Sequence, residues 1–226
     1  MRMTRRSTAY LGAVVAALLL GATIGAEHGY AGGDMVDMTG VQPWDLCGEC
    51  HGLDGAGNRI KFPRLAGQDQ SYLVSELLDF RSGRRTNDDG QMQETSHELK
   101  DKDIPRVANW FAKQTAPWPS PTVDAKPDLA SARQLAVLGD TGTRACLSCH
   151  SAASLGMLDE GFNAPRIAGQ WDYYIAKQLT DYRDGCRSND PKQMMRKIAK
   201  RLTDTQIASL AIFLSQNPNL HQLVVP

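Results

Sequence analysis

Two near-identical pentapeptides constrain this chain more than any other feature of its sequence. Cys-Gly-Glu-Cys-His occupies positions 47–51, and Cys-Leu-Ser-Cys-His occupies positions 146–150. Two cysteines separated by two residues and followed at once by a histidine form the attachment motif of c-type haem. The thiols of such a motif bind the porphyrin covalently, and the imidazole becomes an axial ligand of the iron. The duplication therefore predicts two covalently bound haem c groups.

The motifs predict six haem-binding side chains, four thiols that attach the porphyrins and two imidazoles that bind the irons. These are Cys47, Cys50, Cys146, Cys149, His51 and His150. A zinc site is the competing interpretation of two such cysteine pairs, but its pairs would usually be separated by about 15 to 20 residues. Zinc also gives no reason for a histidine directly after both pairs.

The similarity between the two parts of the chain extends well beyond the pentapeptides. Pro-Arg-Leu-Ala-Gly-Gln at 63–68 is matched by Pro-Arg-Ile-Ala-Gly-Gln at 165–170, and Asp-Phe-Arg at 79–81 by Asp-Tyr-Arg at 181–183. Matched positions stay about 100 residues apart, and such self-similarity indicates an internal tandem duplication.

A proline-rich segment separates the two copies. Residues 116–123 contain three prolines, which forbid helix and favour an extended connection. We therefore expect an N-terminal domain at 32–115, a linker at 116–123 and a C-terminal domain at 124–226. Domains of this size bury little apolar surface by themselves, and a bound haem would supply much of the missing core.

Apolar residues recur at helical spacing in both copies. The pattern predicts helices over 72–80 and 174–182. A capping box at 203–206 predicts a final helix to about residue 215, and its counterpart in the first copy starts near Asp101, where Pro105 falls in the first turn. No segment alternates as a strand would, so the sequence predicts an all-α fold.

A second axial ligand is expected opposite each imidazole. Met92 and Met195 occupy equivalent positions in the two copies, each seven residues before a leucine. A thioether opposite an imidazole raises the reduction potential, which suits electron transfer. We therefore predict Met92 and Met195 as iron ligands. Met194 falls out of register, and His97 has a lysine as its counterpart, so we expect His97 to be a surface residue.

The first 31 residues are typical of an export signal. Arginines near the start precede an uncharged apolar run at 11–24, and small residues at 29 and 31 fit a cleavage site. We expect 1–31 to be a signal peptide and the mature protein to lie in the periplasm. The apolar run is short for a membrane span, although an uncleaved anchor and peripheral membrane association both remain open.

The charge of the chain is balanced overall but divided unevenly. The formal net charge is zero, yet residues 32–114 carry 10 basic and 14 acidic side chains, whereas 124–226 carry 12 basic and 10 acidic ones. Such a dipole can orient a redox protein on its partners. Basic residues form no continuous face, so we expect no nucleic-acid binding.

The motifs, the repeated Pro-Arg-(Leu/Ile)-Ala-Gly-Gln stretches and the methionine spacing together resemble the di-haem cytochrome c4 family. The resemblance covers essentially all of the expected mature chain. It implies two class I cytochrome c domains related by a pseudo-twofold axis, with the haem propionates facing each other. It also implies that the carbonyls of Pro63 and Pro165 accept hydrogen bonds from His51 and His150.

The resemblance also suggests roles for four residues near the propionates or the domain interface, namely Arg64, Arg166, Tyr72 and Tyr174. The sequence departs from the family in two places. Gly40 and Pro43 disfavour a helix before the first motif, which would leave the first haem more exposed or covered by a partner. Cys186 is an additional thiol, interpreted as a free cysteine, with intermolecular pairing or a redox role as the alternatives.

Two irons that each bind a histidine and a methionine have no position for a substrate, which favours electron transfer over catalysis. Expected donors are a quinol-oxidising bc complex or a periplasmic dehydrogenase, and the expected acceptor is a terminal oxidase. One alternative is an electron-accepting subunit, such as the di-haem subunit of flavocytochrome c sulfide dehydrogenase, with Trp44, Trp118 and Trp171 exposed for an interface. A further alternative is a di-haem peroxidase or thiosulfate-oxidising enzyme in which Cys186 competes for an iron.

Overall fold

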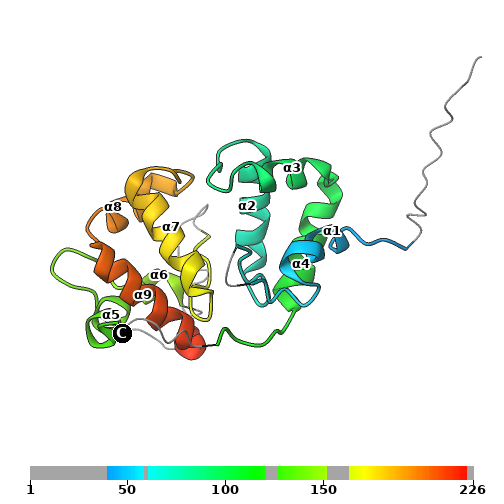
Figure 1. Cartoon of the computed structure of the whole chain (residues 1–226). Helices are drawn as coiled ribbons and strands as arrows, with labels where there is room; N and C mark the ends of the chain where they lie inside the picture. The colour runs from blue at the N-terminus through cyan, green and yellow to red at the C-terminus, as the bar shows by residue number, and fades with distance from the viewer. Residues whose placement is uncertain (1–39, 59–60, 121–126, 152–162, 223–226) are drawn as a thin grey trace, which may run out of the picture. The chain divides into compact units, whose positions relative to one another are not determined.

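The computed structural model describes residues 40–58, 61–120, 127–151 and 163–222. The expected signal peptide lies outside these residues. Within them the structure is helical and contains no strand, which confirms the predicted all-α fold (Figure 1). No helix in the described ranges is both long enough and apolar enough to cross a membrane. We call residues 40–120 the N-terminal half and residues 127–222 the C-terminal half.

The two halves repeat one order of helices (Figure 1). The N-terminal half contains α1 (Asp45–His51), α2 (Gln70–Arg81), α3 (Gln91–Glu98), the short 3-10 helix η1 (Asp101–Asp103) and α4 (Ile104–Lys113). The C-terminal half contains α5 (Leu129–Val137), α6 (Leu147–His150), α7 (Asp172–Asp184), η3 (Pro191–Gln193), α8 (Met194–Ala199), α9 (Asp204–Gln216) and η4 (Pro218–Gln222). Thus α1, α2, α3 and α4 correspond to α6, α7, α8 and α9.

Local sequence signals explain where the long helices begin. Thr203 and Gln206 form the predicted capping box of α9, in which each side chain meets the backbone of the other residue. Asp69 caps α2 by accepting a hydrogen bond from Tyr72 N. Pro105 lies in the first turn of α4, where its missing N–H costs nothing. Residues 116–120, the described part of the expected linker, contain no helix.

Each half has its own apolar core, built mainly from the last helix of the half. In the N-terminal half, Leu73 and Leu77 of α2 pack against Val107 and Phe111 of α4. In the C-terminal half the core joins α5, α7 and α9, and its members include Ala132, Leu135, Ile175, Leu210 and Leu214. The motif cysteines Cys47 and Cys146 contact these cores, so each CxxCH segment is anchored by the same packing that holds the helices.

Two glutamines join the halves by reciprocal hydrogen bonds, which we call the glutamine clamp. Gln170 accepts from Arg64 N at 2.8 Å and donates to Arg64 O at 2.9 Å. Gln68 accepts from Arg166 N at 2.8 Å and donates to Arg166 O at 3.0 Å. Each side-chain amide therefore satisfies both backbone groups of the arginine in the other copy. The last residue of each Pro-Arg-(Leu/Ile)-Ala-Gly-Gln stretch thus holds the other stretch.

A cluster of polar side chains at the contact between the halves has the same symmetry. We call it the arginine network, and its members are Tyr72, Glu76, Arg85, Asn87, Tyr174, Gln178, Arg187 and Asn189. Arg85 contacts Glu76 at 2.5 Å and Tyr174 Oη at 2.9 Å. Arg187 contacts Glu76 at 2.8 Å and Gln178 at 2.7 Å.

The symmetry of the arginine network is broken at one pair of positions. Glu76 of α2 corresponds to Gln178 of α7, so the two arginines share a single carboxylate. Burial alone would raise the pKa of Glu76, but the charges of Arg187 and Arg85 outweigh it and lower that pKa. The glutamate is therefore ionised, and the network holds two positive charges and one negative charge.

Candidate haem sites

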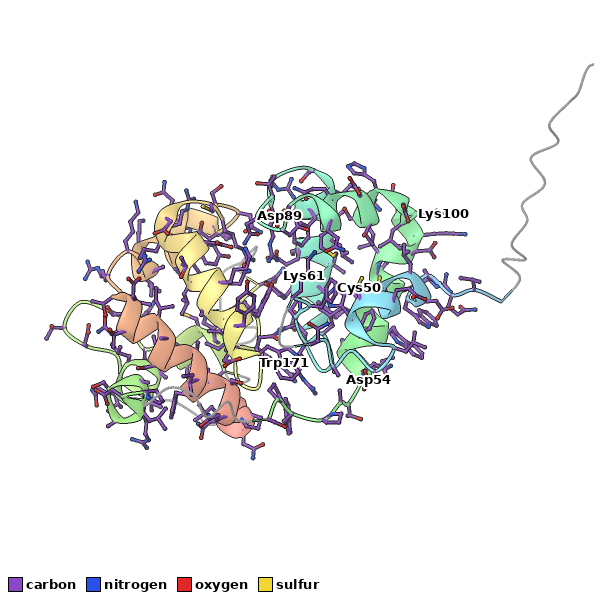
Figure 2. The ribbon with its side chains drawn as sticks, in the orientation of Figure 1. Cys50, Asp54, Lys61, Asp89, Lys100 and Trp171 are labelled. Carbon is purple, nitrogen blue, oxygen red and sulfur yellow. The ribbon has the colours of Figure 1, made fainter. Side chains whose placement is uncertain are left out.

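Each haem motif forms a short helix that carries its thiols and its imidazole on one side. Cys47, Cys50 and His51 lie on α1 (Cys50 is labelled in Figure 2), where residues three and four apart share a face. Cys149 and His150 lie on α6, and Cys146 is its N-cap. His51 and His150 are 6% and 8% exposed. All six side chains line one cavity of about 580 Å³.

Both histidines are oriented by the carbonyls that the family resemblance implies. His51 Nδ1 lies 2.9 Å from Pro63 O, and His150 Nδ1 lies 2.8 Å from Pro165 O. A carbonyl can only accept, so each Nδ1 donates its proton and leaves Nε2 as the nitrogen that can bind iron. Burial lowers the pKa of both imidazoles, although the bonds to the proline carbonyls partly oppose it. Neutral imidazole is the ligand form that a metal requires.

A glycine leaves room for the first of these carbonyls. A Cβ at Gly57 would lie 2.5 Å from Pro63 O, and the residue has a φ of +65°. Both observations require glycine, since the space is closed and the left-handed conformation disfavours other residues. Gly57 N also donates to His51 O at 2.8 Å. The turn after α1 therefore holds the histidine by its ring and by its backbone.

Two of the four motif thiols lie where burial disfavours the thiolate. Burial raises the pKa of Cys47 and of Cys146 to about 11. In the described part of the chain no three His, Cys, Asp or Glu side chains gather closely enough to hold a metal ion. The four motif cysteines thus lie as two separate pairs, each beside its own histidine, rather than as the four-thiolate cluster that a structural zinc ion requires.

The two predicted methionine ligands occupy the same place in equivalent helices. Met92 is the second residue of α3, and Met195 is the second residue of α8. Both line the cavity, and Met194 lines it as well. His97 is exposed on α3, as expected from its lack of a counterpart. The structure therefore brings one histidine and at least one methionine to the cavity from each half.

An unusual backbone precedes each methionine helix. Asp89 and Gly90 have φ values of +60° and +85°, and Lys192 and Gln193 have φ values of +53° and +58°. These pairs are equivalent in the repeat, since each lies two and three residues before the aligned methionine. Left-handed conformations outside glycine carry strain, and such strain concentrates at functional sites. The paired turns fix where each methionine helix starts.

Buried polar atoms at the cavity fit the carboxylates of two porphyrins. Nε of Arg64 and Nε of Arg166 are buried and have no hydrogen-bond partner. Both residues line the cavity, as do Tyr72 and Tyr174. A buried guanidinium nitrogen without an acceptor is costly, and a propionate oxygen is the acceptor that a haem would bring. Together with the thiols, the imidazoles and the methionines, these residues fit haem c.

Two of the three tryptophans expected to be exposed are not. Trp44 stacks on Trp110, with ring centroids 4.4 Å apart, and Trp171 donates from its indole nitrogen to Ala56 O at 2.9 Å (Trp171 is labelled in Figure 2). Both rings find partners inside the protein, which the sequence pattern does not reveal. Trp118 is 47% exposed, and the guanidinium of Arg64 lies over its ring at 4.3 Å from the centroid.

Cys186 lies away from the haem sites. Its thiol is free and exposed, and it does not line the cavity that the haem motifs share. A sulfur in that position does not compete with Met195 for an iron within this structure.

Sequence reasoning missed the residues that join the two sites. Arg85 and Arg187 recur in the repeat, as do Asn87 and Asn189, but arginines next to a predicted helix are normally interpreted as solvated surface. Asn87 donates to Asp181, and Asn189 donates to Asp79, both across the contact. The available signal was the recurrence itself, because matched polar residues in both copies of a duplicated chain are expected where the copies meet.

The chain is similar to characterised cytochromes over most of its length. A family model described as "Cytochrome c" matches residues 39–115. A "Cytochrome c4" of Pseudomonas aeruginosa is 35% identical over 173 residues, which are 75% of this chain and 82% of that relative. A "Thiosulfate dehydrogenase electron acceptor" of Thiomonas intermedia is 35% identical over 178 residues, 76% of this chain and 78% of the relative.

Solved structures give the same result. The reduced recombinant cytochrome c4 from Pseudomonas stutzeri aligns with a TM-score of 0.63 and 33% identity over 76% of this chain and 93% of that one. The thiosulfate dehydrogenase TsdBA from Marichromatium purpuratum aligns with a TM-score of 0.65 and 30% identity over 76% of this chain and 36% of that one.

Proposed function

This chain belongs to the cytochrome c4 family, and on that premise we propose that it carries electrons in the periplasm between a respiratory donor and an acceptor. The protein is a di-haem electron-transfer cytochrome with covalent haem c and two tandem class I cytochrome c domains. The observation that carries the proposal is that each half offers the cavity a histidine and a methionine.

We propose His51 with Met92, and His150 with Met195, as the axial ligands of the two irons. A bound haem supplies a one-electron couple between ferric and ferrous iron. The chain supplies the surroundings of that couple. The proline carbonyls fix the imidazoles, and apolar residues of both cores line the cavity. If His51 with Met92, and His150 with Met195, hold the two irons, neither iron would be available to a substrate.

Substitution of the methionines tests this ligand set. We expect Met92→Leu and Met195→Leu each to remove half of the methionine-to-iron charge-transfer absorption of the oxidised holoprotein, because leucine has no sulfur. Met194→Leu is the matched control, since it alters the neighbouring methionine on the same helix, and it should leave the absorption intact. Loss of the band with Met194→Leu instead of Met195→Leu would reassign the ligand.

The proposed donors are a quinol-oxidising bc complex or a periplasmic dehydrogenase, and the proposed acceptor is a terminal oxidase. The opposite charge balance of the two halves supports two different partners. We keep the proposed domain limits of 32–115 and 124–226, with the linker at 116–123.

A second candidate donor has specific support. Two relatives of this chain are named as electron acceptors of thiosulfate dehydrogenase, and one similar solved structure is a thiosulfate dehydrogenase. In this version the protein is the permanent electron-accepting subunit of a dehydrogenase rather than a shuttle that leaves its donor. Purification under native conditions discriminates the subunit from the shuttle, because a permanent subunit elutes with its dehydrogenase whereas a shuttle elutes alone.

Export and cofactor content are tested together by mass spectrometry of the protein recovered from the periplasm. We expect a chain that starts at Gly32 and carries the added mass of two haems. A chain that keeps residues 1–31 would contradict the proposed signal peptide, and a single added haem would contradict the proposal of two covalent sites.

A further inference from the structure

The two methionine helices carry opposite charges at equivalent positions. Every exposed acidic residue of the α3 segment has an exposed basic residue as its counterpart in the α8 segment. The pairs are Asp89 with Lys192, Glu94 with Lys197, and Glu98 with Arg201, and the exposed His97 corresponds to the exposed Lys200. Asp89 is labelled in Figure 2, in the turn before α3. The reversal thus separates two helices that otherwise have the same place in their halves.

Exposed basic residues gather at the C-terminal end of α8. Lys197 lies in the helix, Lys200 is its C-cap with helical backbone angles, and Arg201 follows in the next turn. Lys197 and Lys200 are three residues apart, so their side chains emerge on the same side. Met195 and Ile198 of the same helix line the haem cavity. An α-helix with its side chains is about 10 Å across. The exposed charges therefore lie about one helix thickness from the cavity. We call Lys197, Lys200 and Arg201 the α8 basic surface.

The charges of Lys197 and Lys200 are not neutralised by any described residue. Lys197 donates to the backbone carbonyl of Lys192 at 3.1 Å, and neither Lys197 nor Lys200 forms an ion pair with any described carboxylate. Arg196 is different, because it pairs with the buried Asp190 at 2.6 Å and is therefore not part of the surface. Arg201 donates to the backbone carbonyl of Gly142. A surface with this charge attracts carboxylates over about a Debye length.

We propose that the α8 basic surface is the docking site for a redox protein whose own cofactor is surrounded by carboxylates. This inference rests on the proposed electron-carrier function and names the class of partner for the C-terminal haem. An acidic partner is attracted to α8 and repelled by α3, so the charge reversal directs it to one of two otherwise similar haem sites. A protein partner fits better than a lipid surface, because electron exchange requires a second cofactor close to the cavity.

The test compares two variants of equal charge. Lys197→Glu/Lys200→Glu alters the α8 basic surface, whereas Lys113→Glu/Arg133→Glu alters exposed residues of α4 and α5 that form no side-chain hydrogen bond or ion pair with a described residue. The probe is plant plastocyanin, an acidic blue-copper protein, used with the holoprotein. Electron exchange is followed by stopped flow at about 0.01 M and about 0.15 M ionic strength. Calorimetric titration with cadmium-substituted plastocyanin, which is redox-inert, measures binding separately.

At low ionic strength we expect the α8 variant to exchange electrons about ten-fold more slowly than the control variant and the wild type, with a matching loss of binding. The difference should shrink at the higher ionic strength, because salt screens exposed charges. Equal rates for the two variants would overturn the proposal, since net charge alone would then account for any change.

Two further results would assign the surface to another occupant and so also overturn the proposal. One is that the wild type, but not the α8 variant, sediments with phosphatidylglycerol vesicles while the plastocyanin rates stay equal. The other is that the wild type self-associates through α8, which sedimentation velocity would detect. Reduction by ascorbate and reoxidation by ferricyanide should succeed in all three proteins. Failure there would contradict the electron-carrier function rather than the docking site.

Discussion

At the scale of single residues, the backbone conformation before α3 and α8 determines where each methionine helix begins. The N-terminal half has glycine at the second left-handed position, Gly90, whereas the C-terminal half has Gln193 there. Glycine takes this conformation without steric cost, but glutamine places a Cβ near its own carbonyl. The C-terminal turn is therefore the more strained of the two.

We predict that Gln193→Gly stabilises the holoprotein by up to about 1 kcal/mol, because relief of the left-handed strain exceeds the added entropy of the unfolded chain. Thermal or urea unfolding measures the change. Gly90→Ala is the reverse test. The added Cβ would meet no atom closer than Gln93 Oε1 at 4.0 Å, so its expected destabilisation of about 1 kcal/mol is conformational rather than steric. Stabilisation by Gly90→Ala would refute the argument.

At the scale of the helices, the exposed side chains in and next to α3 and α8 carry opposite charges. If α8 receives an acidic partner, α3 is suited to a basic one, because Asp89, Glu94 and Glu98 are exposed on or next to it. The same surface would repel the partner of α8.

We predict that Glu94→Lys/Glu98→Lys slows electron exchange with a basic mitochondrial-type cytochrome c by about ten-fold at low ionic strength, since the substitution replaces attraction by repulsion. Exchange with plastocyanin should not fall. The matched control is Asp45→Lys/Glu49→Lys on α1, which makes the same change in net charge. A uniform effect of both variants on both probes would show that the helix has no specific part in recognition.

The four longest helices, α2, α4, α7 and α9, were predictable because their signals are local. The capping box of α9, the proline in the first turn of α4 and the spacing of apolar residues in α2 and α7 each act within a few residues. The half-buried positions of Trp44 and Trp171 were not predictable. Trp44 depends on Trp110 of α4, and Trp171 depends on a backbone carbonyl of the other half, so neither contact leaves a trace in nearby sequence.

The haem sites divide in the same way. Cys47, Cys50 and His51 follow from a contiguous motif, and the methionines follow from the internal alignment. The unpartnered Nε atoms of Arg64 and Arg166, and the cavity that they line, require the folded chain. Periodicity states which face of a helix is polar, but not what that face meets.

At the scale of the whole molecule, the arginine network is where ion pairs join the two halves. Arg85 and Arg187 are 4% and 3% exposed, and Glu76 is the carboxylate that both contact. Removal of one partner from a buried ion pair leaves an uncompensated charge, which typically costs about 3 kcal/mol or more.

We predict that Glu76→Gln destabilises the holoprotein by about 3 kcal/mol in urea unfolding. The pseudo-twofold axis provides the control. Gln178 contacts Arg187 at 2.7 Å and Arg85 at 3.1 Å, so Gln178→Glu in the Glu76→Gln background restores a carboxylate between the same arginines. The double variant should recover most of the loss. A double variant no more stable than Glu76→Gln would show that Glu76 acts through some contact other than the shared arginines.

The same carboxylate makes the contact between the halves sensitive to acid. The pKa of Glu76 is lowered from its ordinary value of 4.5, because Arg187, Arg85 and Asn189 contact its carboxylate, and the Tyr72 hydroxyl lies close enough to interact with it. A depressed pKa means that its stabilisation is complete above about pH 4.5 and is lost as the pH falls through the lower, folded value. We expect the wild type to lose stability over that range by more than Glu76→Gln does, as measured by urea unfolding at successive pH values. Parallel curves would contradict the assignment.

The glutamine clamp contacts only the main chain of its partners, since Gln68 and Gln170 bond to the N–H and C=O of Arg166 and Arg64 and not to their guanidinium groups. Both main-chain groups are present whichever residue other than proline occupies the position. A duplicated protein joined in this manner can accumulate unlike substitutions elsewhere in each copy without coming apart. One copy can then specialise in receiving electrons and the other in donating them, because the contact between the copies does not depend on the side chains that change.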